Sequence, residues 1–174
     1  GPVGVASLNE ELQKLLNPAD RDKAEARIGF RTFREGDRVM QLKNDYDKEV
    51  FNGDQGHIHR IENEGGKMWI EFDKSLVEYE FLEADQLALA YACTIHKSQG
   101  SEFPVVIVPV TVSHYIMLQR NLLYTAITRA KRMCFLLGEK KALGISVKND
   151  KPVSRNTTLE LLLRQGRAAG KLDA

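Results

Sequence analysis

The chain has 174 residues, a hydrophobic fraction of 43%, a charged fraction of 28% and a formal net charge of +1. These values lie close to the averages for soluble globular proteins, which argues against disordered, collagen-like and membrane classes. The length allows one domain, or one domain interrupted by a smaller one. No apolar run approaches the roughly 20 residues that cross a bilayer, and no leader is recognisable, so no membrane partner is expected.

The cysteines indicate a reducing, cytoplasmic location. Cys93 and Cys134 both lie in apolar segments, and neither has a partner spaced for zinc binding or for a redox pair. We therefore expect no metal site in this sequence.

Charge is distributed unevenly along the chain. Residues 33–86 contain 7 basic and 14 acidic side chains, a net charge of −7, and the remaining residues carry +8. A basic body favours a polyanion such as nucleic acid, because contacts with phosphates release counterions. The acidic segment is not expected to follow a phosphate backbone along its whole face.

The first predicted element is a short amphipathic helix over residues 7–17. Ser7 and Glu10 are spaced as a capping box, and four leucines share one face: Leu8, Leu12, Leu15 and Leu16. Pro18 ends this helix. Residues 19–31 are charged and largely aperiodic, which predicts a connector.

A small β unit is predicted over residues 33–85. Strand-like runs cover 38–42, 56–62, 68–72 and 77–81, and glycine-containing turns at 52–54 and 64–66 separate them. This spacing predicts a small barrel whose thin core leans on the larger lobe. Trp69 is expected in that core. Lys43, Lys48 and His57, with Phe51 or Trp69, are weaker candidates for contacts with bases.

After residue 86 the pattern changes to α/β. Apolar runs at 87–91, 105–108 and 133–137 predict buried strands of a parallel sheet, and residues 115–130 predict a helix that covers it. A helical turn is expected at 142–146, and a further helix at 158–164.

The strongest chemical signal is the polar stretch from Thr94 to Glu102, which lies between two of the predicted strands. Ligands bind at the carboxyl ends of strands in open α/β sheets, where loop amides and helix amino termini meet anions. The residues alone leave open a structural alternative, in which Thr94 caps a helix, His96 and Lys97 are solvated, and Gly100 ends a turn.

A second signal is Arg129, which follows a helix whose apolar residues are occupied by the core. A guanidinium stays charged and binds phosphate in a bidentate way, so it can stabilise the charge that develops during phosphoryl transfer. From the residues alone, pairing with a carboxylate at the surface is the alternative.

Together these segments resemble a known family. TIHKSQGSE at 94–102 and YTAITRAK at 124–131 resemble motifs V and VI of superfamily 1 helicases. The opening residues 1–13 look like the lead-in to the second RecA-like lobe of the RecD-like branch. GDRVMQ at 36–41 and FNGDQG at 51–56 are similar to the SH3-like barrel insert of that branch. The resemblance runs from residue 1 to about residue 138.

The resemblance implies an incomplete RecA-like parallel sheet with helices, formed by residues 1–32 and 86–174 and interrupted by an SH3-like β-barrel at 33–85. It also implies the C-terminal motor-lobe fragment of an ATP-dependent DNA helicase that moves 5′ to 3′. The implied partners are single-stranded DNA, the N-terminal RecA-like lobe of the same protein and subunits of a recombination complex.

The family's functional residues carry over to matching positions. Arg129 would act as an arginine finger on the ATP γ-phosphate. Glu102 and Gly100 would face the sugar side of the nucleotide, with Gln99 beside both. Contacts with the DNA strand would come from four residues: Thr94, His96, Lys97 and Ser98.

The sequence has no G-x-x-x-x-G-K-[ST] loop. ATP with Mg²⁺ is therefore expected to be held mainly by an upstream lobe, and the fragment alone is expected to be inactive. Two alternatives remain open: the motor lobe of a conjugative relaxase-helicase, and a non-catalytic module that docks a partner protein.

Overall fold

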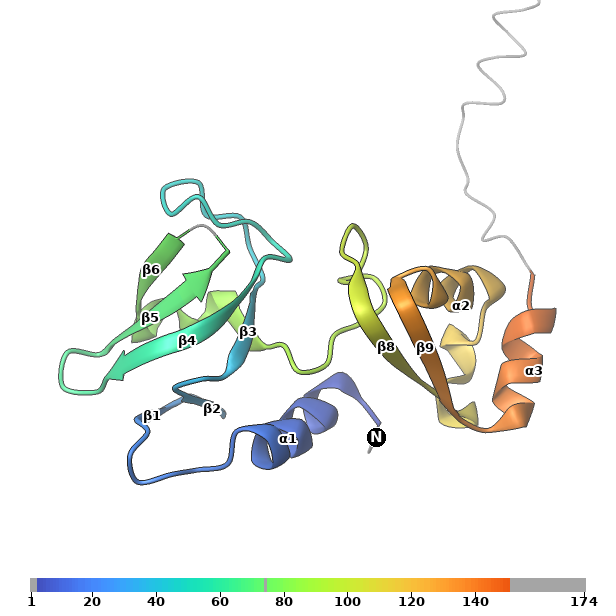
Figure 1. Ribbon diagram of the computed structural model, residues 1–174, viewed down its shortest axis with the longest axis horizontal. Coiled ribbons are helices and arrows are strands. Elements are labelled where there is room, and N and C mark those ends of the chain that lie inside the picture. Colours follow the sequence, from blue (N-terminus) through green and yellow to red (C-terminus); the bar gives the residue numbers. More distant parts are fainter. Residues whose placement is uncertain (1–2, 74, 151–174) are drawn as a thin grey trace, which may run out of the picture.

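The computed structural model describes residues 3–73 and 75–150, and the predicted helix at 158–164 lies outside them. An antiparallel β-barrel unit and a parallel strand pair with its helices lie on opposite sides of the molecule in Figure 1. Helix α1 (Val5–Leu16) lies below the barrel unit in this view. The fold is therefore mixed α/β, as predicted.

The barrel unit contains a five-stranded antiparallel sheet in the order β6-β5-β4-β3-β7. Its strands are β3 (Arg38–Gln41), β4 (Gln55–Glu62), β5 (Lys67–Phe72), β6 (Ser75–Glu80) and β7 (Leu87–Leu89), and the short helix η1 (Phe81–Gln86) joins the last two. The four strands predicted for the barrel are thus confirmed. The turn at 64–66 joins β4 to β5 as predicted, and Gly66 adopts a φ of 64° there.

The run at 87–91 does not join the parallel sheet, so that prediction was wrong. Strand β7 instead pairs antiparallel with β3, with Leu89 opposite Val39. Leu87 is fully buried in the barrel core. A short apolar run has the same pattern in either kind of sheet, so periodicity could not separate the two.

The predicted connector at 19–31 also differs from the structure. Strands β1 (Glu25–Ile28) and β2 (Arg31–Arg34) form an antiparallel hairpin. Ala26 and Phe33 are buried in the barrel core. The hairpin was missed because each of its strands has only four residues, two of them charged, which is too short a run to show the alternation of a strand.

The barrel unit has a hydrophobic core of its own. It contains buried side chains from every strand between β1 and β7, together with Val50 of the loop between β3 and β4 and Ala84 of η1. The strand residues are Ala26, Phe33, Val39, Ile58, Ile61, Met68, Ile70, Phe72, Val77, Tyr79 and Leu87. Trp69 is absent from this cluster, which corrects the prediction. It lies half-buried on the outer face of β5, and the Arg60 guanidinium lies 5.3 Å from its ring centroid.

The second unit is built on two parallel strands, β8 (Phe103–Val110) and β9 (Ala130–Gly138). The predicted parallel pairing of the runs at 105–108 and 133–137 is thus confirmed. The predicted helix at 115–130 is divided into η2 (Val112–Met117) and α2 (Arg120–Ile127), because Gln119 is extended. Residues 142–146 lie within α3 (Lys140–Lys148).

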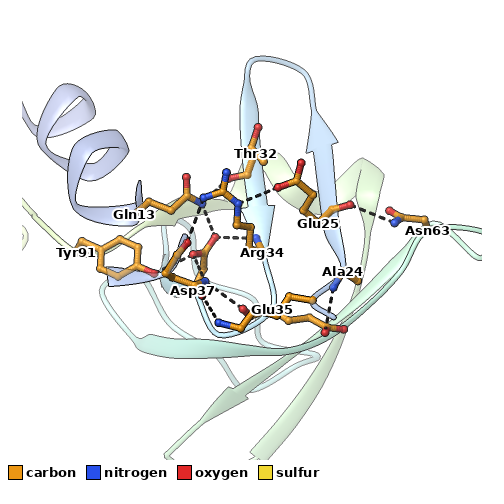
Figure 2. Close-up of polar contacts among 11 residues, drawn as sticks. Gln13, Ala24, Glu25, Thr32, Arg34, Glu35, Asp37, Asn63 and Tyr91 are labelled. Atoms are coloured by element: carbon orange, nitrogen blue, oxygen red, sulfur yellow. Dashed lines mark hydrogen bonds and ion pairs between the residues drawn. The ribbon is translucent and has the colours of Figure 1, made fainter. Parts of the chain in front are cut away.

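Helix α1 attaches to the barrel unit by its polar face. Asn9 and Gln13 are buried, whereas Leu8 and Leu12 are only half-buried and Leu15 and Leu16 are 76% and 67% exposed, so the predicted leucine face is packed only in part. The helix begins at Val5 with Gly4 as its N-cap, and the predicted capping box is absent. Figure 2 shows Gln13 directed at Asp37 of the barrel unit.

Within the described ranges, no helix is long and apolar enough to cross a membrane.

Candidate functional site

Arg129 and the polar loop that ends at Glu102 lie side by side. The backbone N–H of Phe103 donates to the carbonyl of Arg129 at 2.8 Å, and Phe103 lies opposite Ala130 in the register of β8 and β9. Both segments therefore meet at the amino ends of the parallel pair, not at the carboxyl end that we predicted. The chain enters both strands at this edge, because the loop precedes β8 and helix α2 precedes β9.

The Arg129 guanidinium is half-buried, and its bonding partners among the described residues are uncharged acceptors. Its Nη1 donates to the Ser101 carbonyl at 3.1 Å, its Nε to the Thr125 carbonyl at 3.3 Å, and its Nη2 to the Thr128 hydroxyl at 3.5 Å. Among the described residues, no carboxylate forms an ion pair with it. These bonds direct the guanidinium toward the loop at 99–102 and leave its charge uncompensated.

The loop at 99–102 is exposed and open. Gly100 has a φ of +86°, and a Cβ built on it would meet no atom within 4 Å. Gln99 is exposed, and Glu102 lies 3.4 Å from the ammonium of Lys131, with both side chains more than half exposed. An exposed pair of this kind adds little stability, so Glu102 can exchange this partner for another group.

The four predicted DNA-contacting residues share one turn. Thr94, His96 and Lys97 are exposed. Ser98 is buried, and its hydroxyl donates to the Ile95 carbonyl at 2.7 Å. The backbone N–H of Ser98 also donates to the Thr94 carbonyl at 3.1 Å. Ser98 and Thr94 thus hold the turn together, since the Thr94 hydroxyl accepts from the N–H of Lys97 at 3.3 Å, while the side chains of His96 and Lys97 are presented to solvent.

This turn faces the barrel across a polar cleft of about 480 Å³. His96, Lys97, Gln99 and Ser101 line one side, and the barrel turn Asn52-Gly53-Asp54 lines the other. The sequence had marked residues 52–54 only as a turn. Their place opposite His96 depends on how the two units meet, and no local pattern reports that.

The basic residues considered for the barrel are engaged locally. Lys43 pairs with Asp85 and Lys48 with Glu83, each at 2.6 Å. The Lys48 ammonium also lies 4.2 Å from the centroid of the Tyr79 ring. Phe51 and Tyr46 pack edge to face, with centroids 5.9 Å apart. These side chains therefore have partners on the barrel itself.

Two family descriptions match the chain. Residues 8–72 match the SH3 domain of ATP-dependent RecD-like DNA helicases, and residues 89–137 match the UvrD-like helicase C-terminal domain. The chain therefore belongs to the class of superfamily 1 helicases. Within this class, the barrel match and the relatives below confirm the predicted resemblance to the C-terminal motor region of the RecD-like branch.

Curated relatives support this assignment over nearly the whole chain. The ATP-dependent RecD2 DNA helicase of Deinococcus radiodurans is 40% identical over 91% of this chain and 21% of its own length. The RecBCD enzyme subunit RecD of Haemophilus influenzae is 31% identical over 92% of this chain and 23% of its own length. The chain thus spans about a fifth to a quarter of these two relatives.

Solved structures of Pif1 helicases share the fold. Bacteroides Pif1 bound to single-stranded DNA matches with a TM-score of 0.55 and 20% identity, over 98% of this chain and 45% of that chain. A Pif1 structure described for DNA unwinding at forked duplexes matches with a TM-score of 0.56 and 22% identity, over 96% of this chain and 42% of that chain. At these sequence identities the similarity shows a shared fold and no more.

Proposed function

We propose that this chain is the C-terminal motor lobe of a RecD-like, ATP-dependent DNA helicase that moves 5′ to 3′. In this proposal an N-terminal lobe holds ATP with Mg²⁺, Arg129 acts on that ATP, and the turn at 94–98 holds single-stranded DNA. The observation that carries the proposal is the position of Arg129 beside the loop at 99–102. The predicted domain division at residues 32/33 and 85/86 is part of the same proposal, with the barrel unit extended to include β1, β2 and β7, because side chains of these strands lie in its core.

The chemistry of these residues fits a nucleotide. Hydrolysis spreads negative charge over the oxygens of the transferred phosphoryl group, and a guanidinium from a second lobe stabilises that charge. The bonds of Arg129 to uncharged acceptors keep its positive charge available. Gly100 leaves open space in which a ligand can approach the backbone, and Gln99 and Glu102 offer polar groups for the sugar.

The turn at 94–98 offers the groups that a DNA strand needs. Lys97 contributes a positive charge, and Thr94 and His96 contribute hydrogen-bonding groups at the same surface. This turn continues directly into the loop at 99–102, so one segment carries both proposed contacts. A shift of the loop during ATP binding would therefore move the DNA-contacting side chains directly, because no other element lies between the loop and the turn.

The proposal is tested in the complete protein that carries this chain. Arg129→Ala is expected to lower DNA-stimulated ATP turnover by about a thousandfold or more, because an arginine finger contributes that much to kcat. The Kd for single-stranded DNA is expected to change far less. Arg132→Ala, an exposed arginine on β9, is the matched control. Equal turnover in both variants would remove Arg129 from this role.

His96→Ala tests the DNA half of the proposal. The expected result is weaker stimulation of ATP turnover by single-stranded DNA, measured by titration with an oligonucleotide. Stimulation identical to that of the unmodified protein would contradict the assignment. Unwinding of substrates with a 5′ or a 3′ overhang tests the direction of movement.

One relative is named as a subunit of the RecBCD enzyme, so the proposal also includes subunits of a recombination complex as partners of the complete protein.

A further inference from the structure

Asp37 is a fully buried acidic residue at the turn between β2 and β3. Its backbone is fixed in the barrel, because the carbonyl of Asp37 accepts from the N–H of Ile58 at 2.9 Å and the N–H of Gly36 donates to the Ile58 carbonyl at 2.7 Å. The position of its carboxyl group is therefore set by the barrel. None of the functions proposed above uses this residue.

Four donors from three parts of the chain converge on this carboxyl group, and Figure 2 shows part of this network. Gln13 and Asn17 donate their side-chain amides from the region of α1, at 2.6 and 2.7 Å. The backbone N–H of Arg34 donates at 2.7 Å, and the Tyr91 hydroxyl donates at 2.8 Å.

All four donors are uncharged groups. Within the described ranges, no lysine, arginine or histidine forms an ion pair with Asp37. A buried acidic group that is satisfied by hydrogen bonds alone depends on each donor, since a lost donor is not replaced by water. The arrangement therefore fixes α1 and Tyr91 relative to the barrel.

Tyr91 lies three residues before Thr94, where the proposed DNA turn begins. The intervening Ala92 is held on both sides by Asn9 of α1: its N–H donates to Asn9 Oδ1 at 2.8 Å, and its carbonyl accepts from Asn9 Nδ2 at 2.9 Å. Tyr91 and Ala92 are thus clamped to the barrel and to α1 immediately before the turn.

We propose that Asp37 is a positioning residue for the DNA-contacting turn, acting through the Tyr91 hydroxyl and the Asn9–Ala92 clamp. The inference rests on the proposed function of that turn. The buried carboxyl group makes the barrel, α1 and the start of the turn one rigid unit. The exposed side chains of Thr94, His96 and Lys97 then meet the strand in a prearranged geometry, which lowers the entropic cost of binding.

The Tyr91 hydroxyl is suited to this link. Burial, with the hydrogen bond and the charge of Asp37, raises the pKa of Tyr91 to about 12. The hydroxyl therefore remains a donor throughout the range in which a helicase is assayed.

Tyr91→Phe in the complete protein is the central test, because it removes one hydroxyl and keeps the ring. We expect the concentration of single-stranded DNA that half-stimulates ATP turnover to rise about three- to tenfold, with little change in kcat at saturating DNA. Amide hydrogen exchange in residues 92–99 should become faster. Asp37→Asn should raise the same half-stimulating concentration, and the double variant should show less than the combined effect.

Tyr79→Phe is the matched control. The Tyr79 hydroxyl is also buried and donates to Gln41 Oε1 at 3.1 Å, but it lies inside the barrel, away from the turn. A merely structural role for Tyr91 predicts equal losses of thermal stability in the two variants and an unchanged DNA requirement, which would overturn the inference. Unchanged exchange in residues 92–99 would overturn it as well.

Failure of the proposed function gives a different pattern. If the turn does not contact DNA, His96→Ala also leaves the DNA requirement unchanged. If only the positioning role is wrong, His96→Ala raises this requirement and Tyr91→Phe does not.

Discussion

At the scale of single residues, a comparison of Gly100 with Gly144 separates the effect of backbone conformation from the effect of side-chain packing. Neither position has an atom within 4 Å of a built Cβ, but only Gly100 has a positive φ, of +86°. Gly100→Ala is expected to destabilise the loop by about 1 kcal/mol and to weaken ATP binding, since L-residues resist this conformation. The Kd for ATP in the complete protein measures the effect.

Gly144→Ala is the matched substitution, because Gly144 lies within α3. It is expected to stabilise the chain by about 0.5–1 kcal/mol in denaturant unfolding, with the Kd for ATP unchanged. Equal effects of the two alanines on ATP binding would contradict the importance of the loop conformation.

At this scale, candidate site residues could be found from the sequence where they lie together in one contiguous motif. Arg129 and the segment from Thr94 to Glu102 could be singled out as candidates because each lies within such a string, and the structure brings the two together. Asp37 and its donors could not be identified. Polar residues on a helix normally face solvent, and only the tertiary fold shows that Gln13 meets a buried carboxyl group.

At the scale of elements, α1 departs from the usual rule that a helix buries its apolar face. Its leucine pattern correctly predicted a helix, but only Leu8 and Leu12 of the predicted face are even half-buried, and the buried residues are the polar Asn9 and Gln13. The same limit applied to β7, whose apolar run fits a parallel or an antiparallel partner equally well. In both cases the element was predictable, and its neighbour was not, because the neighbour is distant in sequence.

Because α1 buries the polar Gln13 and exposes the apolar Leu16, a substitution at Gln13 should change stability more than one at Leu16. Gln13→Leu adds apolar surface but removes a donor from buried Asp37, so we expect a loss of about 1–3 kcal/mol. Leu16→Gln changes an exposed side chain and should alter stability by less than about 0.5 kcal/mol. Urea unfolding measures both. A larger loss for Leu16→Gln would show that the leucine face is packed after all.

At the scale of the whole molecule, the described residues leave one apolar face of the parallel pair uncovered. Five of its side chains share one face and are about half exposed: Val105, Ile107, Met133, Phe135 and Leu137. Parallel sheets are normally covered on both faces. We therefore expect further sequence of the complete protein to cover this stripe, in keeping with the chain's 21% share of its Deinococcus relative.

Replacing Ile107 and Phe135 together by lysine tests this expectation. In the chain alone, the double variant should bind less hydrophobic dye and self-associate less in light scattering. In the complete protein it should lower thermal stability. Leu76→Lys with Leu82→Lys, at exposed barrel positions, is the control and should change neither measurement strongly. Unchanged stability of the complete protein would mean that the stripe remains open.

The account as a whole depends on Arg129 reaching ATP that is held by another lobe. The direct measurement is single-turnover ATP hydrolysis by the complete protein with saturating single-stranded DNA. With Arg129→Ala, and also with Arg129→Lys because lysine lacks the guanidinium fork, we expect the hydrolysis rate to fall about a thousandfold or more while ATP binding changes about tenfold or less. Hydrolysis within about twofold of the Arg132→Ala control would contradict the account.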